Sequence, residues 1–420
     1  MGMRGFSVDA GRRGVRLLVV GLTLGAGACA AEPLDDDDEG VVQTEGALRA
    51  PAASWEALGG DLNPAPGQSL SDPSLLRASL AHPVVAFSAF DPVTGSKQSF
   101  VLRWKRGGWS QLGTPLAGTG PFVALDEDGD CDGGLAGRLY ACFVPDGAGP
   151  VVQRWDGDTW SPLGGDVSVE TGYQRTRYSV SGCDGMVLDR PGRPTITWTA
   201  DTGSKSDYPY VARWNQRDQI WTGLGPDTVG EVGQRATSAA LAFGGDHRAY
   251  LMTHKPGGSY GGDLTTRLWR WDRSASDWIQ LGADLLATDY PTIVTRHHDV
   301  YLALRDDASG AISVMRWRQD AWSSLSSPGV GVSPALAFTS SGSLVIAFVD
   351  EGVPATLRVA RLHRGAWHEV GAGVATFDQK FPGHLELGFD DRDRPIVAWV
   401  ESDLELHDAI FVKRYGDSLP

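Results

Sequence analysis

One acidic stretch of the chain, DEDGDCDGG at 126–134, has the composition of a cation site. Within it, Asp128, Asp130 and Asp132 occupy alternate positions, and Gly133 follows them. Alternating carboxylates followed by a glycine let a backbone wrap a hard cation, so that oxygen atoms converge on it from one side. The stretch therefore predicts a structural Ca²⁺ site on these three aspartates, and the alternative is a solvated turn.

From Asp128 onward, the stretch resembles the beginning of an EF-hand loop, and it is similar to the calcium hairpins of integrin-type propellers. Both resemblances imply Ca²⁺ as the ligand. The match ends at Ala136, where the propeller hairpin has an aspartate, and at Leu139, where the EF-hand has a bidentate glutamate. We expect no other cofactor, because the sequence has no P-loop, dinucleotide fingerprint or H-E-x-x-H pair.

The N-terminus has the pattern of an export signal. Four arginines precede the apolar run LLVVGLTLGAGA at 17–28, which is too short to span a bilayer. The sequence therefore predicts a signal peptide over 1–28. The ending AGAC resembles the bacterial lipobox, which implies that Cys29 carries a lipid and anchors the protein in the outer membrane; the alternative is a soluble secreted or periplasmic protein.

Charge limits the possible partners. Residues 29–51 are polar and acidic without an apolar period, which predicts a disordered tether. The formal net charge is -15 at pH 7, and removing 1–28 would delete four arginines and Asp9, which gives -18. We therefore expect no nucleic-acid partner, and membrane contact only through the lipid anchor.

Three further cysteines, Cys131, Cys142 and Cys183, follow Cys29. Disulfides persist in exported proteins. Cys131 and Cys142 frame the acidic stretch, so we expect a bridge between them; the competing pair is Cys142 with Cys183. Either pairing leaves one thiol over.

A repeat from residue 52 onward determines the expected fold. Its unit is an arginine and, in most copies, an aromatic residue, then a polar turn and Trp-x-x-Leu/Val-Gly, as in RWKRGGWSQLG, RWDGDTWSPLG and RWDRSASDWIQLG. The second tryptophans lie 44 to 61 residues apart, at Trp109, Trp160, Trp221, Trp278, Trp322 and Trp367. Repeats of this length are typical of propellers, and we expect the tryptophans to fill the wedges between blades.

Two half-units remain at the ends of this region. SWEALGG around Trp55 lacks the preceding strand, and VKRYG around Tyr415 lacks the following one. Joined, they complete a seventh unit and remove free sheet edges. The sequence therefore predicts an all-β domain at 52–420, a monomeric seven-bladed β-propeller of four-stranded blades in which the Trp55 strand joins the C-terminal blade.

The repeat resembles bacterial Trp-x-x-Leu-Gly propellers of a broadly kelch-like type, and the resemblance covers the chain apart from 1–51. Two departures are visible. The kelch Gly-Gly doublet does not recur in each unit, and the sialidase motif Ser-x-Asp-x-Gly-x-x-Trp is absent.

Loop lengths differ between the two faces of the expected ring. Loops between strands 2 and 3 and between blades share a long-loop face, while the 1–2 and 3–4 hairpins share a short-loop face. Long loops on a rigid scaffold commonly hold binding residues. The candidate ligand-binding residues are Tyr173, Arg175, Tyr178, Tyr208, His254, Tyr260, Asp263 and Tyr290.

Acidic residues recur at the end of strand 2, which would place a ring of carboxylates near the mouth of the central channel. The alternative is that they form turns by accepting backbone N–H groups. The six are Asp91, Asp146, Asp201, Asp306, Asp350 and Glu401.

Two classes of function are compatible with these features. The first is a binding module that recognises a glycan or a protein through the long-loop face. The second is a carbohydrate-active hydrolase or lyase that uses loop carboxylates. A His–carboxylate pair or two carboxylates that converge in a deep cleft would favour the enzyme.

Overall fold

The computed structural model divides the chain into two units, 1–48 and 49–420, and the residues that it describes all lie in the second unit. The described residues are 54–63, 68–76, 82–126, 139–173, 180–189, 192–201, 207–225, 229, 236, 238–255, 265–286, 291–306, 308–352, 355–375, 384–402 and 408–416.

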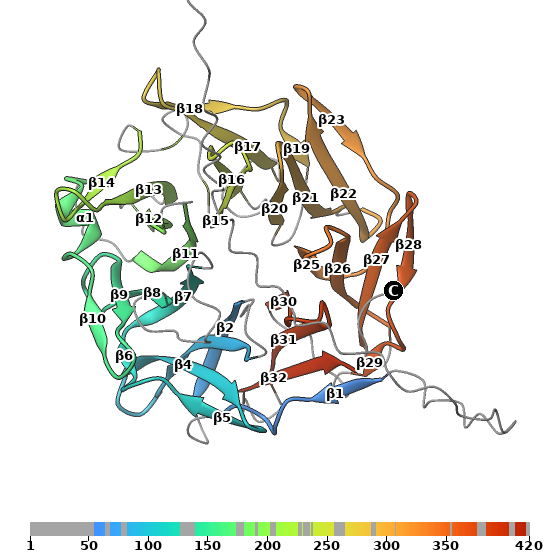
Figure 1. Ribbon diagram of the computed structural model, residues 1–420, viewed down its shortest axis with the longest axis horizontal. Coiled ribbons are helices and arrows are strands. Elements are labelled where there is room, and N and C mark those ends of the chain that lie inside the picture. Colours follow the sequence, from blue (N-terminus) through green and yellow to red (C-terminus); the bar gives the residue numbers. More distant parts are fainter. Residues whose placement is uncertain are drawn as a thin grey trace, which may run out of the picture. The chain divides into compact units, whose positions relative to one another are not determined.

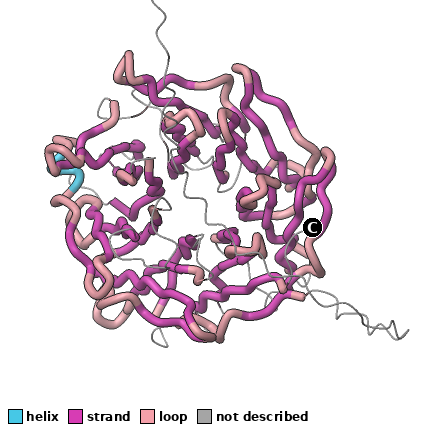
Figure 2. The backbone as a smooth tube through the Cα atoms, viewed as in Figure 1, coloured by secondary structure: helices cyan, strands magenta, loops and turns pink. Residues whose placement is uncertain are grey.

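The second unit is a seven-bladed β-propeller, as predicted. Seven antiparallel sheets, each built on four strands, are arranged as blades around a central axis (Figure 1). Within each blade, strand 1 lies nearest the axis and strand 4 at the rim. Figure 2 shows that strands account for nearly all of the regular structure.

The blades follow one another in chain order. Blade 1 contains β2 (Ser69–Leu76), β3 (Val84–Phe90), β4 (Lys97–Lys105) and β5 (Gly108–Gln111); blade 2 contains β7 (Thr119–Leu125), β8 (Leu139–Val144), β9 (Val151–Trp155) and β10 (Trp160–Pro162); blade 3 contains β11 (Val180–Leu188), β12 (Pro194–Asp201), β13 (Asp207–Asn215) and β14 (Ile220–Gly223); blade 4 contains β15 (Ser238–Phe243), β16 (Ala249–Lys255), β17 (Thr265–Asp272) and β18 (Asp277–Gln280). Blade 5 contains β20 (Thr292–Arg296), β21 (Asp299–Arg305), β22 (Ala311–Arg318) and β23 (Ala321–Ser324); blade 6 contains β25 (Val332–Phe338), β26 (Leu344–Asp350), β27 (Thr356–His363) and β28 (Ala366–Glu369); blade 7 contains β30 (Leu385–Phe389), β31 (Pro395–Ser402), β32 (Asp408–Tyr415) and β1 (Trp55–Ala57). Four short strands extend blades 1, 4, 5 and 6 by pairing with their third strands: β6 (Leu116–Ala117), β19 (Leu285–Leu286), β24 (Gly329–Val330) and β29 (Val374–Ala375).

The ring closes as the two half-units predicted. β1 pairs antiparallel with β32, and Trp55 lies opposite Tyr415. The two rings are 5.4 Å apart between centroids. Blade 7 therefore contains strands from both ends of the propeller, and this pairing removes the free edges that an open ring would expose.

The hydrophobic core is divided among the blade boundaries, because the second strands are buried on both faces. In β3, Val85 and Phe87 pack toward blade 7, while Val84 and Ala86 pack toward blade 2. Seven clusters of buried side chains result, one at each boundary between neighbouring blades. A period-2 strand can serve two boundaries in this way because successive side chains point to opposite faces.

Five of the six repeated tryptophans form a hydrogen bond to the preceding blade. The Nε1 group of Trp160 donates to the carbonyl oxygen of Leu112 at 2.8 Å, and Trp278 makes the same bond to Leu224 at 2.8 Å. Trp109, Trp221 and Trp367 donate to Leu58, Leu163 and Ser326. The tryptophan of one unit thus caps the Trp-x-x-Leu segment of the preceding unit, which confirms the expected structural role of these residues.

The glycine that ends the motif is required by the same contact. Gly113 has φ +67°, and a Cβ atom there would lie 3.0 Å from atoms of Trp155 and Trp160 in the next blade. A side chain would therefore meet two indole rings as well as the left-handed backbone conformation, which only glycine adopts without cost.

The disulfide prediction was wrong. Cys142 of β8 is bonded to Cys183 of β11, so the bridge joins blades 2 and 3 instead of stapling the acidic stretch. The two Cα atoms are 6.1 Å apart, within the range that a disulfide spans. The sequence-based expectation followed chain proximity, whereas the ring places neighbouring blades in direct contact. Cys131 lies outside the described residues.

The described residues contain one short helix, α1 (Val167–Glu170), in the connection between blades 2 and 3. Asp166 caps it by accepting hydrogen bonds from the N–H groups of Ser168 and Val169. Over the ranges described here, no helix is long and apolar enough to cross a membrane.

Candidate functional site: the central channel

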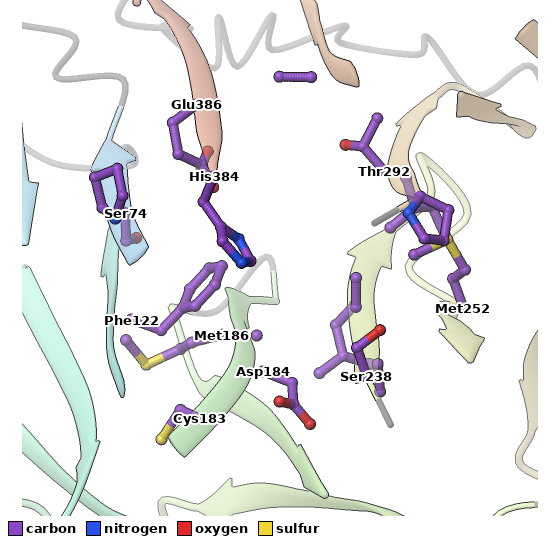
Figure 3. Close-up of a pocket in the computed structure, with 18 of the residues that line it drawn as sticks. Ser74, Phe122, Cys183, Asp184, Met186, Ser238, Met252, Thr292, His384 and Glu386 are labelled. Atoms are coloured by element: carbon purple, nitrogen blue, oxygen red, sulfur yellow. The ribbon is translucent and has the colours of Figure 1, made fainter. Parts of the chain in front are cut away.

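The first strands of all seven blades enclose a cavity of about 500 Å³ in the central channel. Its lining residues lie mostly in the first halves of these strands, where the chain arrives from the loops between blades. The cavity therefore lies nearer to the long-loop face. Figure 3 shows the polar side chains that surround it.

His384 and Glu386 bring a histidine and a carboxylate into this cavity from blade 7. They flank Leu385 at the start of β30, and alternate residues of a strand point to opposite sides. Leu385 and Leu387 pack into the cluster between blades 6 and 7. His384 and Glu386 consequently face the channel (Figure 3).

Asp184 adds a second carboxylate from blade 3. It lies in β11, whose pairing with β12 shifts register on both sides of Cys183. Such bulges redirect side chains. Asp184 and Cys183 both line the cavity, so the disulfide fixes the backbone next to the carboxylate (Figure 3).

Close backbone packing supports this part of the wall. A Cβ atom on Gly120 of β7 would lie 2.5 Å from the Cα atom of Gly182 in β11, and Gly120 has φ +59°. Glycine is therefore required where blades 2 and 3 approach each other at the channel.

Apolar side chains form another part of the surface. Phe122 and Met186 line the cavity near Asp184, and Met252 lines it from blade 4 (Figure 3). Ser74, Ser238 and Thr292 add side chains with hydroxyl groups. A pocket with an apolar wall and a few convergent polar groups is the usual form of a small-ligand site.

The predicted ligand-binding residues that the structure describes have other surroundings. Tyr173 is buried and packs against Trp198 and Tyr210, with centroid distances of 5.9 and 5.2 Å. His254 is also buried, and its Nδ1 atom lies 3.1 Å from the hydroxyl of Thr266. Tyr208 is half-buried in β13. The other five lie outside the described residues: Arg175, Tyr178, Tyr260, Asp263 and Tyr290.

The recurring acids at the end of strand 2 include clear turn formers. Asp91 accepts hydrogen bonds from the hydroxyl of Thr94 and from the N–H groups of Val93 and Thr94, which lower its pKa. Asp306 is held in the same way by the hydroxyl and N–H of Ser309, and its pKa is also lowered. These carboxylates are bound by their own loops, as expected for turns.

The remaining acids of this set pair with other groups. Asp350 accepts from Arg358 at 2.9 Å, and Asp146 lies 3.6 Å from the ammonium of Lys97. Glu401 is buried and accepts from the indole of Trp399 at 2.5 Å. None of these five described carboxylates lines the channel cavity. The side chain of Asp201 is outside the described set.

The predicted calcium ligands, Asp128, Asp130 and Asp132, lie outside the described residues, and so does Cys29. Within the described parts of the chain, no group of three or more His, Cys, Asp or Glu side chains could hold a metal ion.

Sequence reasoning missed His384, Glu386 and Asp184. The sequence indicates that these residues are unusual, but it does not show that they line the same cavity. Polar residues at the start of an otherwise apolar first strand, as in HLELGF and CDGMVL, are unusual where that strand packs against its neighbours. Their convergence depends on the ring, which brings blade 7 and blade 3 to one axis.

Comparison with known proteins supports the fold. No family model matches the sequence, and no curated protein matches it. Among solved structures, an ulvan lyase of a polysaccharide lyase family matches with a TM-score of 0.50 and 10% identity, over 84% of this chain and 95% of that chain. The likeness is one of fold, and the kelch-like relationship stays a prediction.

Two further solved structures match less closely. A Dyadobacter fermentans protein of unknown function has 12% identity and a TM-score of 0.47, over 84% of this chain and 95% of that chain. The sialidase of Trypanosoma rangeli has 10% identity and a TM-score of 0.48, over 87% of this chain and 60% of that chain.

Proposed function

We propose that this propeller binds a glycan through the central channel, with His384, Glu386 and Asp184 as the polar contacts. The observation that carries the proposal is that these three side chains line one cavity together with apolar residues. Carboxylates accept hydrogen bonds from sugar hydroxyls, and an imidazole can both accept and donate them. Phe122 adds an aromatic ring to the same cavity.

Binding to a glycan panel tests the proposal. We expect Glu386→Gln and Asp184→Asn to lower the affinity for the glycan that wild type binds by at least about tenfold, because each removes a charge-assisted hydrogen bond. Asp146→Asn is the matched control, since Asp146 is an exposed carboxylate that does not line the cavity. Equal affinity of all three variants would contradict a channel site. If wild type bound no glycan of the panel, a protein partner would be the remaining ligand class.

A hydrolase or lyase is the second candidate, favoured by the histidine and two carboxylates in the same cavity. Such groups act as general acid and general base when they reach a substrate. The ulvan lyase noted above and the sialidase are carbohydrate-active by name. Product release from the bound glycan tests this candidate: His384→Ala and Glu386→Gln should abolish turnover, and wild type that binds without turnover would exclude it.

We also propose that the protein is exported and anchored by a lipid on Cys29. The support is the arginine-flanked apolar run and the AGAC ending. Labelled fatty acid should enter the wild-type chain and not Cys29→Ser, which should appear in the soluble fraction. Unlabelled wild type in a soluble fraction would instead support a cleaved signal peptide.

A structural Ca²⁺ ion on Asp128, Asp130 and Asp132 stays a proposal that rests on their spacing. An ion present at a hundred times its Kd stabilises the folded state by about 2.7 kcal/mol. Thermal unfolding with calcium and with a chelator should therefore differ for wild type and coincide for Asp130→Ala. Coincident curves for wild type would favour the solvated turn.

A further inference from the structure

A second cavity lies away from the channel, on the short-loop face between blades 3 and 4. Its volume is about 640 Å³. It is lined by the 1–2 hairpins of both blades and by the 3–4 hairpin of blade 4. We call it the arginine groove, because Arg193, Arg248, Arg270 and Arg273 line it.

The three aspartates of the arginine groove are already engaged by hydrogen bonds. Asp189 accepts from the backbone N–H and guanidinium of Arg193, the latter at 2.6 and 2.9 Å. Asp246 accepts from the backbone N–H of Arg248 at 3.1 Å.

Asp272 closes its own hairpin. It accepts from the N–H and hydroxyl of Ser274 and from the N–H of Ala275. Its pKa is lowered by these bonds, and the charge of Arg270 contributes less. The carboxylate is therefore committed to the turn.

Two guanidinium groups of the arginine groove have no carboxylate partner among the described residues. Arg193 and Arg248 form ion pairs with Asp189 and Asp246, at 2.6 and 3.5 Å. Arg270 and Arg273 form none, although Arg270 is half-buried in β17. With four arginines and three aspartates in its lining, the groove has a net charge of +1 in a chain whose formal net charge is -15.

Arg213 adds another positive charge close to the groove. Burial lowers the pKa of Arg213, which lies beside Asp189, and the positive charges of Arg193 and Arg273 lower it further against the attraction of Asp189. An anion between these groups would relieve the repulsion.

We propose that the arginine groove binds a phosphate group, with Arg270 and Arg273 as its principal contacts. A phosphate monoester has a charge near -2 at neutral pH, and its oxygens can accept from the two guanidiniums that form no ion pair in the groove. Arginine presents a fork of donors suited to phosphate oxygens. The arginine groove is independent of the channel, which lies at the other end of the first strands, so this proposal does not rest on the proposed function.

Calorimetric titration of the full chain with methyl phosphate, at constant ionic strength and pH 7.5, tests the proposal. We expect saturable binding to wild type and at least about tenfold weaker binding to Arg270→Gln and to Arg273→Gln. Methyl sulfate has a similar shape and one negative charge less, so it should bind more weakly than methyl phosphate.

Arg217→Gln is the matched control. Arg217 is exposed in the 3–4 hairpin of blade 3, at the position that Ser274 has in blade 4, and it does not line the arginine groove. The control should bind methyl phosphate as wild type does. Absent binding, equal binding of methyl sulfate, or equal weakening by Arg217→Gln would each overturn the proposal.

Two larger probes distinguish the source of the phosphate. A hexose 6-phosphate that binds more tightly than methyl phosphate would assign a sugar phosphate. Vesicles with phosphatidate that bind wild type and not Arg273→Gln would assign a lipid headgroup. Thermal unfolding of each variant without ligand verifies that the fold is intact, since Arg273 is exposed and its substitution leaves the core unchanged.

Discussion

The indole of Trp322 lacks the hydrogen bond that the other repeated tryptophans make. Its Nε1 atom is buried without a hydrogen-bond partner in the described structure. Trp109, Trp160, Trp221, Trp278 and Trp367 all donate to the preceding blade. The boundary between blades 4 and 5 thus has the same packing with one polar contact fewer, and its energetic consequence can be measured.

We expect Trp322→Phe to destabilise the protein by about 1 kcal/mol less than Trp160→Phe. Both changes remove part of a half-buried ring, but only Trp160→Phe breaks a hydrogen bond and leaves a carbonyl oxygen without its donor. Urea unfolding of the two variants measures the difference. Equal losses would mean that the indole hydrogen bond contributes nothing to the blade boundary.

Tyr250 should titrate far above an ordinary tyrosine. Burial of its hydroxyl raises the pKa to about 12, and the charge of Asp246 acts in the same direction. The folded state then binds more protons than the unfolded state between about pH 10 and 12, so the free energy of unfolding falls over this range. The absorbance of tyrosinate follows the titration: the difference between wild type and Tyr250→Phe should have its midpoint near 12, and a midpoint near 10 would contradict the burial.

Single residues of the channel could not be predicted from the sequence. The turn-forming aspartates could, because Asp91 and Asp306 act within their own loops. His384 and Asp184 come from different blades, and their meeting depends on the number of blades and on the bulges of β11. The position of Tyr173 in a long loop predicts a ligand-binding residue, but Tyr173 follows α1 and packs into the core between blades 2 and 3.

At the scale of the strand and its turn, the Trp-x-x-Leu-Gly motif is a connector. It ends the outer strand of one blade and receives the indole ring of the next. The repeat was visible in the sequence because each copy needs the same residues for the same contact. Gly113 and Gly147 distinguish the effect of backbone conformation from the effect of packing. Both have left-handed φ, at +67° and +69°, but only Gly113 lies against another blade.

Gly113→Ala should cost about 2–4 kcal/mol, and Gly147→Ala about 1 kcal/mol. The left-handed backbone accounts for about 1 kcal/mol in both variants. The remainder at Gly113 comes from overpacking against Trp155 and Trp160. Thermal or urea unfolding of the pair gives the difference directly. Similar losses of stability in the two variants would mean that the cost at Gly113 comes from backbone conformation and not from the contact between blades.

At the scale of the molecule, the ring brings residues that are far apart in the sequence into contact. The repeat count and the two half-units were sufficient to predict seven blades and their closure. The disulfide was not predictable in the same way, because the hairpin and blade-neighbour pairings both satisfied the spacing. Contact between blades 2 and 3 decides between them.

Peptide mapping without reduction should recover Cys142 linked to Cys183. We expect reduction, or the double change Cys142→Ser with Cys183→Ser, to lower the free energy of unfolding by about 2–4 kcal/mol, because the bridge closes a loop of 41 positions. A peptide that links Cys131 to Cys142 would instead support the pairing that the sequence predicts.

The pairing of β1 with β32 also determines the order in which the blades can fold during synthesis. Trp55 leaves the ribosome early, while its partner Tyr415 belongs to the last strand of the ring. Blades 1 to 6 have all their strands before that moment, so they are free to form during translation. Blade 7 completes only after β32 has emerged, and contacts of such long range form slowly. Closure of the ring is therefore the step at which the nascent propeller loses its open edges.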